Sequence, residues 1–448
     1  MREGSLEAPT RHPLPWREEA FYDEAQLDAE TRRIFDICHG CRRCFNLCDS
    51  FPRLFDLIDE SETGELDSVD SKDFKPVVDA CTLCDMCFMT KCPYVPPHAF
   101  NLDFPHLMLR WRAVAARKAG GPGFAEAQLT KTDRNGRLAA MAPGLANWAS
   151  DEKNRATRGA LETIAGVHRE ARLPKFTGTP LTKRAAKTPA APKADAPGAG
   201  RKAVLYATCT GEWNKPGIGE AALKVLALNG VETRVDYPGC CGMPQLESGA
   251  IGAVVDKAAR VADAFAPMIA EGWDVIALVP SCALMMKFEW PLLDPENAAL
   301  KTLAKATFDI SEYVVGLAKG PGLAEGRAPL DGGVAVHIAC HARAQNMGQK
   351  AAEMLRLIPE TKITPIERCA GHGGSWGVMK ENFEIGLKVG KPVFKQAVKS
   401  QAAYVVSECP LAADHILQGM ERMEGEAAIP PRAWSPIELL AKSYGLID

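Results

Sequence analysis

Short apolar runs alternate with longer segments of helical spacing throughout residues 201–448. Strands that alternate with helices in this way favour a parallel sheet covered by helices, because parallel strands need crossover connections. The runs that we predict to be strands are residues 203–208, 232–237, 274–280, 333–339, 362–366 and 403–407. The fold class expected for this part of the chain is therefore α/β with parallel strands.

The first part of the chain has helical spacing. Apolar side chains recur every three or four residues over 16–37 and again over 104–120. The second of these segments also carries Arg110, Arg112 and Arg117. A basic amphipathic helix of this kind can lie on a membrane or a partner, but an apolar stripe is more commonly packed in a core. We predict a mainly helical N-terminal unit whose second helix packs on its own domain.

Residues 174–200 change to a composition of Lys, Ala, Pro, Thr and Gly with few apolar side chains. Such a segment cannot bury enough surface to fold and is expected to be a flexible linker. It divides the chain into an N-terminal domain, residues 1–173, and a second unit, residues 201–448. An internal repeat divides the second unit into halves at residues 201–325 and 326–448.

A cysteine follows each predicted strand within three residues. These cysteines are Cys209, Cys240, Cys241, Cys282, Cys340, Cys369 and Cys409. Cysteines of the second half follow those of the first at offsets of 131, 129 and 127 residues, which indicates an internal duplication. Open α/β sheets bind ligands at the carboxyl ends of their strands, so these thiols are expected where ligands bind. Buried structural cysteine is the alternative for any one of them.

Composition and charge exclude several classes of protein. The chain of 448 residues has 46% hydrophobic and 24% charged residues, as in ordinary globular proteins. Its net charge of −3 provides no field that would attract nucleic acid. Residues 1–15 lack the apolar centre of a secretory signal, and the longest apolar run, residues 275–286, is too short to span a bilayer. With 15 cysteines, mostly clustered, we expect a cytoplasmic protein that binds metal.

Two cysteine quartets lie in the N-terminal domain. They are the Cys-x2-Cys-x2-Cys-x3-Cys run Cys38, Cys41, Cys44 and Cys48, and the Cys-x2-Cys-x2-Cys-x4-Cys run Cys81, Cys84, Cys87 and Cys92. Three cysteines at steps of three offer three thiolates to one face of a cubic cluster, and both runs resemble the ligand sets of two-cluster ferredoxins. Structural zinc usually uses two separated cysteine pairs, and disulfides among so many neighbouring cysteines are less expected.

This resemblance implies a ferredoxin-type domain with two [4Fe-4S] clusters whose fourth ligands are exchanged between the runs. One cluster would take Cys38, Cys41, Cys44 and Cys92, and the other Cys81, Cys84, Cys87 and Cys48. The exchange joins two segments across the acidic spacer 49–80, which we expect to be a solvated loop or a patch that steers a basic partner. We also expect the clusters to hold together a domain that has little core of its own.

The sequence Cys240-Cys241-Gly242, preceded by Cys209 and followed by Pro280-Ser281-Cys282, resembles the cysteine-rich CCG domain of heterodisulfide reductase. Two such halves behind a double quartet resemble the iron-sulfur subunits of anaerobic glycerol-3-phosphate dehydrogenase and glycolate oxidase. The resemblance implies electron transfer between a flavoprotein dehydrogenase and a quinone or disulfide acceptor. Because the longest apolar run is too short to span a bilayer, we also expect a protein without a transmembrane segment that associates with the membrane, if at all, through a partner.

Both halves depart from the CCG pattern, in which a closing Cys-x2-Cys helps to hold an unusual four-iron cluster. The closing pair is reduced to Cys282 with Met285 in the first half and to Cys409 with Ala412 in the second. The doubled cysteine of the second half is also lost, because Ala370 follows Cys369. Neither half therefore keeps five thiolates.

The residues that remain define two further candidate sites. The first half keeps enough thiols for a third iron-sulfur cluster or zinc, namely Cys209, Cys240, Cys241 and Cys282. In the second half we hypothesise a Cys/His metal or catalytic redox site that comprises Cys340, His341, Cys369, His372 and Cys409. A histidine that only satisfies the core is the alternative for each imidazole.

These observations predict the iron-sulfur electron-transfer subunit of an oxidoreductase. A stand-alone thiol/disulfide or peroxide reductase acting at the second-half site is one alternative, and a zinc scaffold without redox activity is another. Residues 217–222 superficially resemble a dinucleotide fingerprint, but the loop before them is too long for its tight turn. The glycine-rich residues 371–375 can cradle an anion or let the backbone approach a cluster, and we favour the second reading.

Overall fold

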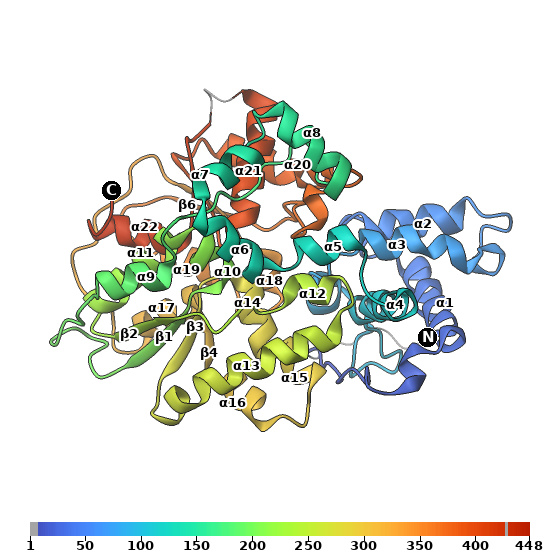
Figure 1. Ribbon diagram of the computed structural model, residues 1–448, viewed down its shortest axis with the longest axis horizontal. Helices are drawn as coiled ribbons and strands as arrows, with labels where there is room; N and C mark the ends of the chain where they lie inside the picture. Colours follow the sequence, from blue (N-terminus) through green and yellow to red (C-terminus); the bar gives the residue numbers. More distant parts are fainter. Residues whose placement is uncertain (1–7, 426–428) are drawn as a thin grey trace.

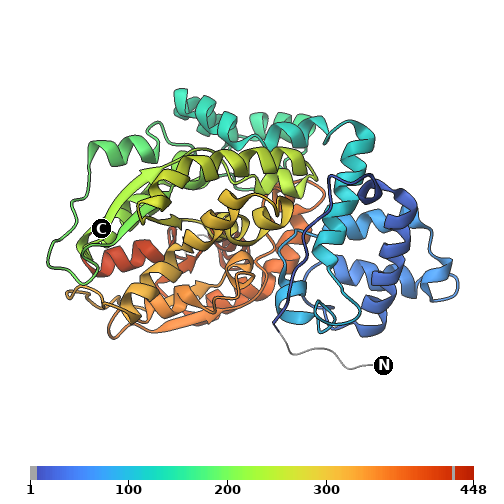
Figure 2. The same cartoon turned by 90° about the horizontal axis from the view of Figure 1, so that it is seen from below.

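The computed structural model describes residues 8–425 and 429–448, and its helical N-terminal unit lies beside two α/β halves (Figure 1). A run of short helices leads from this unit back across the α/β halves, as the view from below also shows (Figure 2). Residues 1–7, which belong to the segment predicted not to be a secretory signal, lie outside the described residues.

The N-terminal unit is helical, as its spacing predicts. Its elements are η1 Glu19–Tyr22, α1 Glu24–Cys41, α2 Ser50–Asp59, η2 Leu66–Ser68, η3 Ser71–Phe74, α3 Lys75–Ala80, η4 Cys87–Lys91 and α4 Phe104–Ala119. The side chain of Asp23 caps α1, and Gly120 ends α4 in the left-handed conformation. Trp111 Nε1 of α4 donates a hydrogen bond to Thr31 Oγ1 of α1 at 2.7 Å. The basic amphipathic helix therefore packs within its own unit.

The N-terminal unit also has a hydrophobic core, so the expectation of little core was wrong. The rings of Phe35, Phe51, Phe55 and Phe74 are at most 2% exposed. Phe35 packs edge to face on Phe74 with ring centroids 5.1 Å apart. Three of these rings belong to the spacer 49–80, which forms α2 and α3 rather than a solvated loop. The acidic residues dominate the composition there, but the apolar side chains between them share one helical face, and each buried ring contributes about 1.5–3 kcal/mol.

Short helices continue the chain after α4. They are α5 Phe124–Leu129, α6 Thr132–Met141, α7 Pro143–Ser150, α8 Arg155–Ala165 and α9 Leu181–Lys187. The structure shows packed chain where the composition of residues 174–200 predicts a flexible linker: Leu181 of α9 is fully buried, and Lys193 N donates to Ala227 O at 2.8 Å. Composition underestimates how closely this segment packs. It is attached to the first half by main-chain hydrogen bonds and one leucine rather than by an apolar surface.

The first half is a four-stranded parallel sheet with the strand order β2-β1-β3-β4. Its elements are β1 Lys202–Tyr206, α10 Thr208–Trp213, α11 Pro216–Leu228, β2 Glu232–Asp236, α12 Met243–Glu247, α13 Ile251–Ala270, β3 Asp274–Ala277, α14 Pro280–Leu284, η5 Met285–Glu289, α15 Trp290–Leu293, α16 Ala298–Ala306, β4 Thr307–Asp309 and α17 Ile310–Lys319. In β1, Val204 pairs with Arg234 on one side and Val275 on the other.

The second half repeats this topology with the order β6-β5-β7-β8, again parallel. Its elements are β5 Val334–His337, α18 Cys340–Arg343, α19 Lys350–Leu355, β6 Ile363–Ile366, η6 Trp376–Val378, α20 Phe383–Ser400, β7 Tyr404–Ser407, α21 Pro410–Glu424, β8 Ala433–Trp434 and α22 Pro436–Ser443. The shared order confirms the predicted duplication and α/β class. The edge strands β4 and β8 escaped prediction because two or three residues make no recognisable apolar run.

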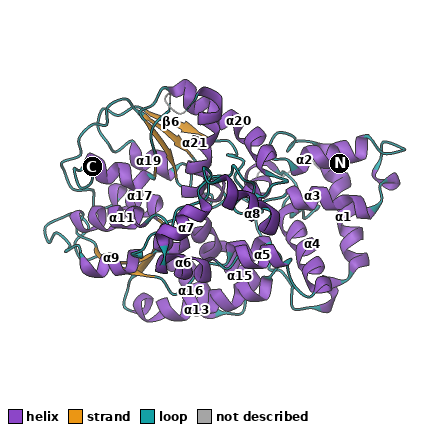
Figure 3. Cartoon of the chain, turned by 45° about the horizontal axis from the view of Figure 1, so that its top comes forward, coloured by secondary structure: helices purple, strands orange, loops and turns teal. Residues whose placement is uncertain are grey.

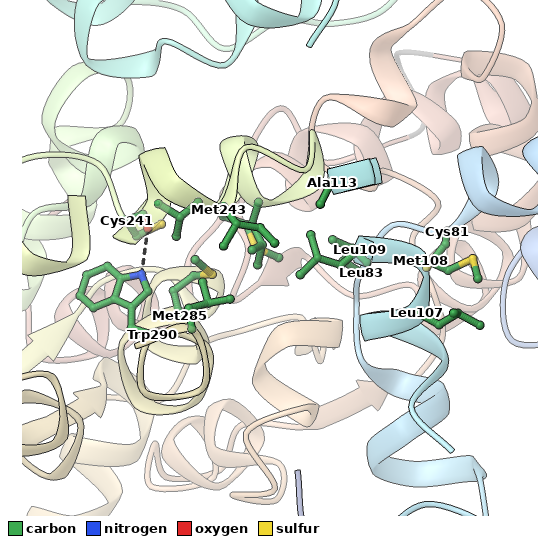
Figure 4. Close-up of a cluster of buried hydrophobic side chains, with 14 of the residues drawn as sticks. Cys81, Leu83, Leu107, Met108, Leu109, Ala113, Cys241, Met243, Met285 and Trp290 are labelled. Atoms are coloured by element: carbon green, nitrogen blue, oxygen red, sulfur yellow. Dashed lines mark hydrogen bonds between the residues drawn. The ribbon is translucent and has the colours of Figure 1, made fainter. Parts of the chain in front are cut away.

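Two hydrophobic cores join the units. One lies between the halves and includes Ile276 of β3, Val336 of β5 and Leu440 of α22. The other joins the N-terminal unit to the first half, where Leu83 and Leu109 lie beside Met243, as the close-up shows (Figure 4). Helix predominates over strand in both halves (Figure 3). Within the described residues, no helix is long and apolar enough to cross a membrane.

The guanidinium group of Arg11 connects the segment before η1 to the rest of the N-terminal unit and to the first half. Arg11 donates to Asp85 at 2.9 Å, to Asp103 at 2.8 Å and to Glu289 of η5 at 2.8 Å. His106 Nε2 lies 3.2 Å from the same Glu289. Although burial opposes it, the charges of Arg11 and His106 lower the pKa of Glu289 to about 2. Arg11 is therefore the cation that all three carboxylates share, and His106 adds to its effect at Glu289.

We predict that Arg11→Met destabilises the protein by about 3–5 kcal/mol, because it leaves buried carboxylates without a counter-charge. Arg17→Met is the matched control, since the exposed pair between Arg17 and Asp294 is worth at most about 1 kcal/mol. Thermal unfolding of the anaerobic full chain measures both. Equal losses for the two variants would show that the Arg11 network does not stabilise the domain junction.

Candidate metal centres

The first candidate centre forms where α1 ends. Cys38 and Cys41 occupy the last turn of α1, and Arg42 adopts a left-handed conformation with φ 50° that turns the chain towards Cys44. Cys92 follows the short π-helical turn η4. The four cysteines line one small cavity together with Phe51, Phe55 and Tyr94. Burial, and then the proximity of Cys92, Cys44 and Cys41, raises the pKa of the Cys38 thiol.

The second candidate centre is built on the chain after α3. Cys84 stands between two left-handed residues, Leu83 with φ 47° and Asp85 with φ 59°, so the backbone coils tightly from Cys81 to Cys87. Burial, and then the proximity of Cys84 and Cys81, raises the pKa of Cys87. The same causes, in the same order, raise the pKa of Cys48. The structure thus brings Cys48 to the second cysteine segment and Cys92 to the first.

Two cysteines from the second half join this second group. The Cys340 thiol hydrogen-bonds to both Cys369 and Cys84, and these contacts together with burial raise its pKa. The hydrogen bond from Cys340 lowers the pKa of Cys369 to about 7, although burial opposes the shift. Cys48 also lies near Cys369. Six cysteines from two units therefore meet at the carboxyl ends of β5 and β6, a convergence that cysteine spacing does not predict.

The glycine-rich loop after β6 lies against the same segment. A Cβ at Gly373 would lie 2.5 Å from Cγ2 of Thr82, the residue between Cys81 and Leu83. A Cβ at Gly371 would lie 1.9 Å from the carbonyl oxygen of Gly386 in α20. Both glycines have positive φ, so the sequence Gly-His-Gly-Gly lets the backbone fit between α20 and the second cysteine segment.

The other residues of the second-half hypothesis lie in different surroundings. His341 Nε2 is 3.4 Å from Leu83 O, and burial lowers its pKa. Burial, and then the neighbouring His415, lowers the pKa of His372 to about 3. The two rings meet edge to face at 5.6 Å. Burial raises the pKa of Cys409, the N-cap residue that precedes α21. Sequence reasoning missed His415 because it lies in the interior of a predicted helix, away from any cysteine.

The four cysteines of the first half form a continuous chain of thiol contacts. Cys209 contacts Cys240, Cys240 contacts Cys241, and Cys241 contacts Cys282. Hydrogen bonds from Cys209 and Cys241, and then the charge of Lys257, lower the pKa of Cys240 well below its usual value. These residues follow β1, β2 and β3, whose carboxyl ends share one edge of the sheet, with Cys209 in α10 and Cys282 in α14.

Side chains from distant elements surround these four thiols. Asp133 of α6 accepts hydrogen bonds from Cys240 N at 3.3 Å, from Lys257 Nζ at 2.9 Å and from the hydroxyl of Tyr237. Trp290 Nε1 donates to Cys241 O at 3.1 Å (Figure 4). Sequence reasoning missed Asp133 and Trp290, and no local signal marks them, because each lies far along the chain from its cysteine.

The donor chemistry of these groups fits iron-sulfur clusters. Thiolates are the ligands that such clusters prefer, and apolar and aromatic side chains line the cavity of the first group. Backbone N–H groups also point at sulfur: Tyr94 N lies 3.4 Å from Cys92 Sγ, and Gly371 N lies 3.4 Å from Cys369 Sγ. Over residues 8–425 and 429–448, no three His, Cys, Asp or Glu side chains converge closely enough to hold a single metal ion.

Both α/β halves match a known protein family, and longer stretches of the chain are similar to known proteins. A family model described as the CCG cysteine-rich domain matches residues 203–287 and 334–411. One of the subunits of the anaerobic glycerol-3-phosphate dehydrogenase of Escherichia coli is 26% identical over 341 residues, 74% of this chain and 80% of that protein. Lactate utilization protein A of Geobacillus kaustophilus is 30% identical over 190 residues, 40% of this chain and 74% of that protein.

An uncharacterized iron-sulfur protein of Methanocaldococcus jannaschii is 25% identical over 248 residues, 54% of this chain and 46% of that protein. The two segments matched by the family model contain all seven cysteines of the α/β halves. Both sheets, with the same strand order, lie in these segments apart from their edge strands β4 and β8. The chain therefore belongs to the CCG cysteine-rich domain family, together with iron-sulfur proteins and subunits of oxidoreductases.

Proposed function

We propose that this protein is an iron-sulfur electron-transfer subunit of an oxidoreductase, with two [4Fe-4S] clusters in its N-terminal domain. One cluster takes Cys38, Cys41, Cys44 and Cys92, and the other takes Cys81, Cys84, Cys87 and Cys48. The observation that carries this proposal is the exchange of the fourth cysteine between the two segments, which is the arrangement of two-cluster ferredoxins.

The protein residues around the thiols support such a role. When bound, each cluster supplies a one-electron carrier whose potential depends on hydrogen bonds and solvent exposure. Phe51, Phe55 and Tyr94 line the cavity of the first group, and the N–H of Tyr94 favours the Cys92 thiolate. The second group lies deeper, because the glycine-rich loop of the second half covers it.

We infer a division of labour that follows the domains expected from the sequence. Residues 1–173 hold the two clusters, residues 201–325 hold a third cluster at Cys209, Cys240, Cys241 and Cys282, and residues 326–448 bring Cys340 and Cys369 against the second cluster group. The contact between Cys340 and Cys84 supports this order, since it places thiols of the second half against the second cluster group.

The donor in this scheme is a flavoprotein dehydrogenase partner, and the acceptor is a quinone or a disulfide. Helices α5 to α8 support a partner surface because they expose large apolar side chains, which are Phe124, Leu138, Met141, Leu145, Trp148 and Ile164. The exposed cations Lys131, Arg134 and Arg137 on or beside α6 suit an acidic partner. A cytoplasmic protein held at the membrane through such a partner fits this arrangement.

A stand-alone disulfide or peroxide reductase is the second candidate function. The observation that favours it is the pair formed by Cys340 and Cys369, in which the hydrogen bond from Cys340 stabilises the thiolate of Cys369. His341, His372 and Cys409 would complete the catalytic residues of this alternative. A zinc scaffold is the remaining alternative, and it would yield a colourless protein.

We predict that anaerobic protein contains about eight iron atoms per chain in the N-terminal domain and shows two reduced cluster signals by EPR. Cys92→Ser should alter the same signal as Cys38→Ser, and Cys48→Ser should alter the same signal as Cys84→Ser. The reason is that Cys92 lies in the first group and Cys48 in the second. Pairing of Cys48→Ser with Cys38→Ser instead would refute the exchange, and iron at trace levels would end the proposal.

The rate of cysteine alkylation distinguishes the electron-transfer proposal from the reductase alternative. With iodoacetamide under argon, we expect Cys340 and Cys369 of the iron-loaded protein to be labelled at least tenfold more slowly than after denaturation, because both are packed against the second group. Peptide mapping by mass spectrometry measures the labelling. Fast labelling of Cys369, accompanied by turnover of a peroxide that Cys369→Ser abolishes, would favour the reductase.

A further inference from the structure

Two cysteines of the second half are not needed by the proposed clusters. A [4Fe-4S] cluster takes four thiolates, and the second group supplies them from four cysteines of the N-terminal unit. Cys340 and Cys369 lie against this group and are therefore surplus to it. The second half has three cysteines in all, because Ala370 stands where the first half has Cys241. It thus has too few thiols for a cluster of its own.

The paired strands β5 and β6 bring the two surplus cysteines together. His337 of β5 lies opposite Ile366 of β6, and the pairing continues in the hydrogen bond from Ile338 N to Ile366 O at 3.0 Å. Cys340 and Cys369 each follow three residues after these paired positions. Neighbouring strands lie about 4.8 Å apart, and a disulfide joins Cα atoms that are about 4.4–6.8 Å apart. The register therefore favours a bond between the two sulfurs, which are in hydrogen-bond contact.

Hydrogen bonds hold the chain next to each cysteine of the pair. His337 Nε2 donates to the carbonyl oxygen of Arg368, the residue before Cys369, at 3.0 Å. Ala339 N, in the residue before Cys340, donates to a carboxylate oxygen at the end of β7 at 3.0 Å. Because both positions are fixed, an S–S bond can form and break with little movement of the backbone.

The pair has a cluster ligand on one side and solvent on the other. Cys340 contacts Cys84, which the proposed function assigns to the second cluster. Cys340 and Cys369 are both partly exposed, and Glu367 and Arg368 beside Cys369 are exposed. A small molecule from solution can therefore reach thiols that also touch the second group.

The number of electrons also suits a disulfide. Each of the two N-terminal clusters carries one electron, and reduction of one disulfide takes two. In this step the S–S bond receives one electron from each reduced cluster and two protons from solvent, and two thiols form. In the reverse direction, a low-molecular-weight disulfide removes the two electrons by thiol–disulfide exchange, so the S–S bond of the pair forms and that molecule leaves as two thiols.

We propose that Cys340 and Cys369 form a reversible disulfide that collects the single electrons of the two N-terminal clusters and passes them on as a pair. The inference rests on the proposed function and deepens it, because it gives the second half a two-electron site. It differs from the stand-alone reductase, since the electrons come from the clusters and the pair acts without His372 and Cys409.

Peptide mapping tests the bond itself. The anaerobic, iron-loaded full chain is reduced, desalted and exposed to oxidised glutathione, and its free thiols are then blocked with N-ethylmaleimide in acidic denaturant, which halts exchange. We expect a pair of peptides joined through Cys340 and Cys369. Cys340→Ser should abolish this linkage and Cys409→Ser should preserve it. The reverse pattern, or failure of Cys340 and Cys369 to leave the thiol state, would refute the pairing.

A reductive titration with photoreduced deazaflavin tests the transfer of electrons. Starting from the linked form, the unaltered chain should take up about two more electrons than the double variant Cys340→Ser/Cys369→Ser before its cluster EPR signals are complete. Free thiols at both positions should appear during the titration. Equal uptake by the two chains, or a linkage that persists while the clusters are fully reduced, would overturn the proposal.

Iron content and EPR signals separate this inference from the proposed function. We expect the double variant to hold as much iron as the unaltered chain and to retain both cluster signals, which also shows that it has folded. Loss of the second signal would mean that Cys340 or Cys369 is a cluster ligand, which would rule out the disulfide and leave the proposed function standing. Trace iron in the unaltered chain would end the proposed function, whether or not the linkage forms.

Discussion

Burial of cysteine sulfur at the junction of the N-terminal unit and the second half is the constraint on which the arrangement of this protein depends. Cys48, Cys81, Cys84 and Cys87 meet Cys340 and Cys369 there, so thiols from two units share one environment. Buried thiolates repel one another and lack water, so such a convergence needs compensation by positive charge or by metal. The domain interface and the proposed chemistry therefore have the same physical origin.

The two halves share a topology but use their cysteines differently. In the first half, four thiols contact one another in sequence and are surrounded by Asp133, Lys257 and Trp290. In the second half, Cys340 and Cys369, two of its three cysteines, lie against the N-terminal unit. The replacement of the doubled cysteine by Ala370 is consistent with this difference. Cys340 and Cys369 face the N-terminal unit, whose own cysteines lie beside them.

Electrostatic pairing and close backbone approach fix how the units meet. Arg11 joins carboxylates of the N-terminal unit to Glu289 of the first half, and Arg112 of α4 donates to the carbonyl of Glu247. A Cβ at Gly249 would lie 2.5 Å from the backbone of Arg112, so α4 and the first half touch through main chain there. These contacts leave a cavity of about 450 Å³ between the units.

The sequence by itself determined the six main strands, the duplication and the cysteine sets, because each is a local pattern of apolar spacing or of fixed offsets. Composition misjudged the spacer 49–80 and the segment 174–200, where a few inward-facing side chains such as Phe55 and Leu181 outweigh many polar ones. Only the tertiary structure decided that Cys340 contacts Cys84, that Asp133 reaches Cys240 and that Glu247 and Trp376 line one cavity. These residues are far apart along the chain, and nothing in local spacing encodes which surfaces of the three units will pack together.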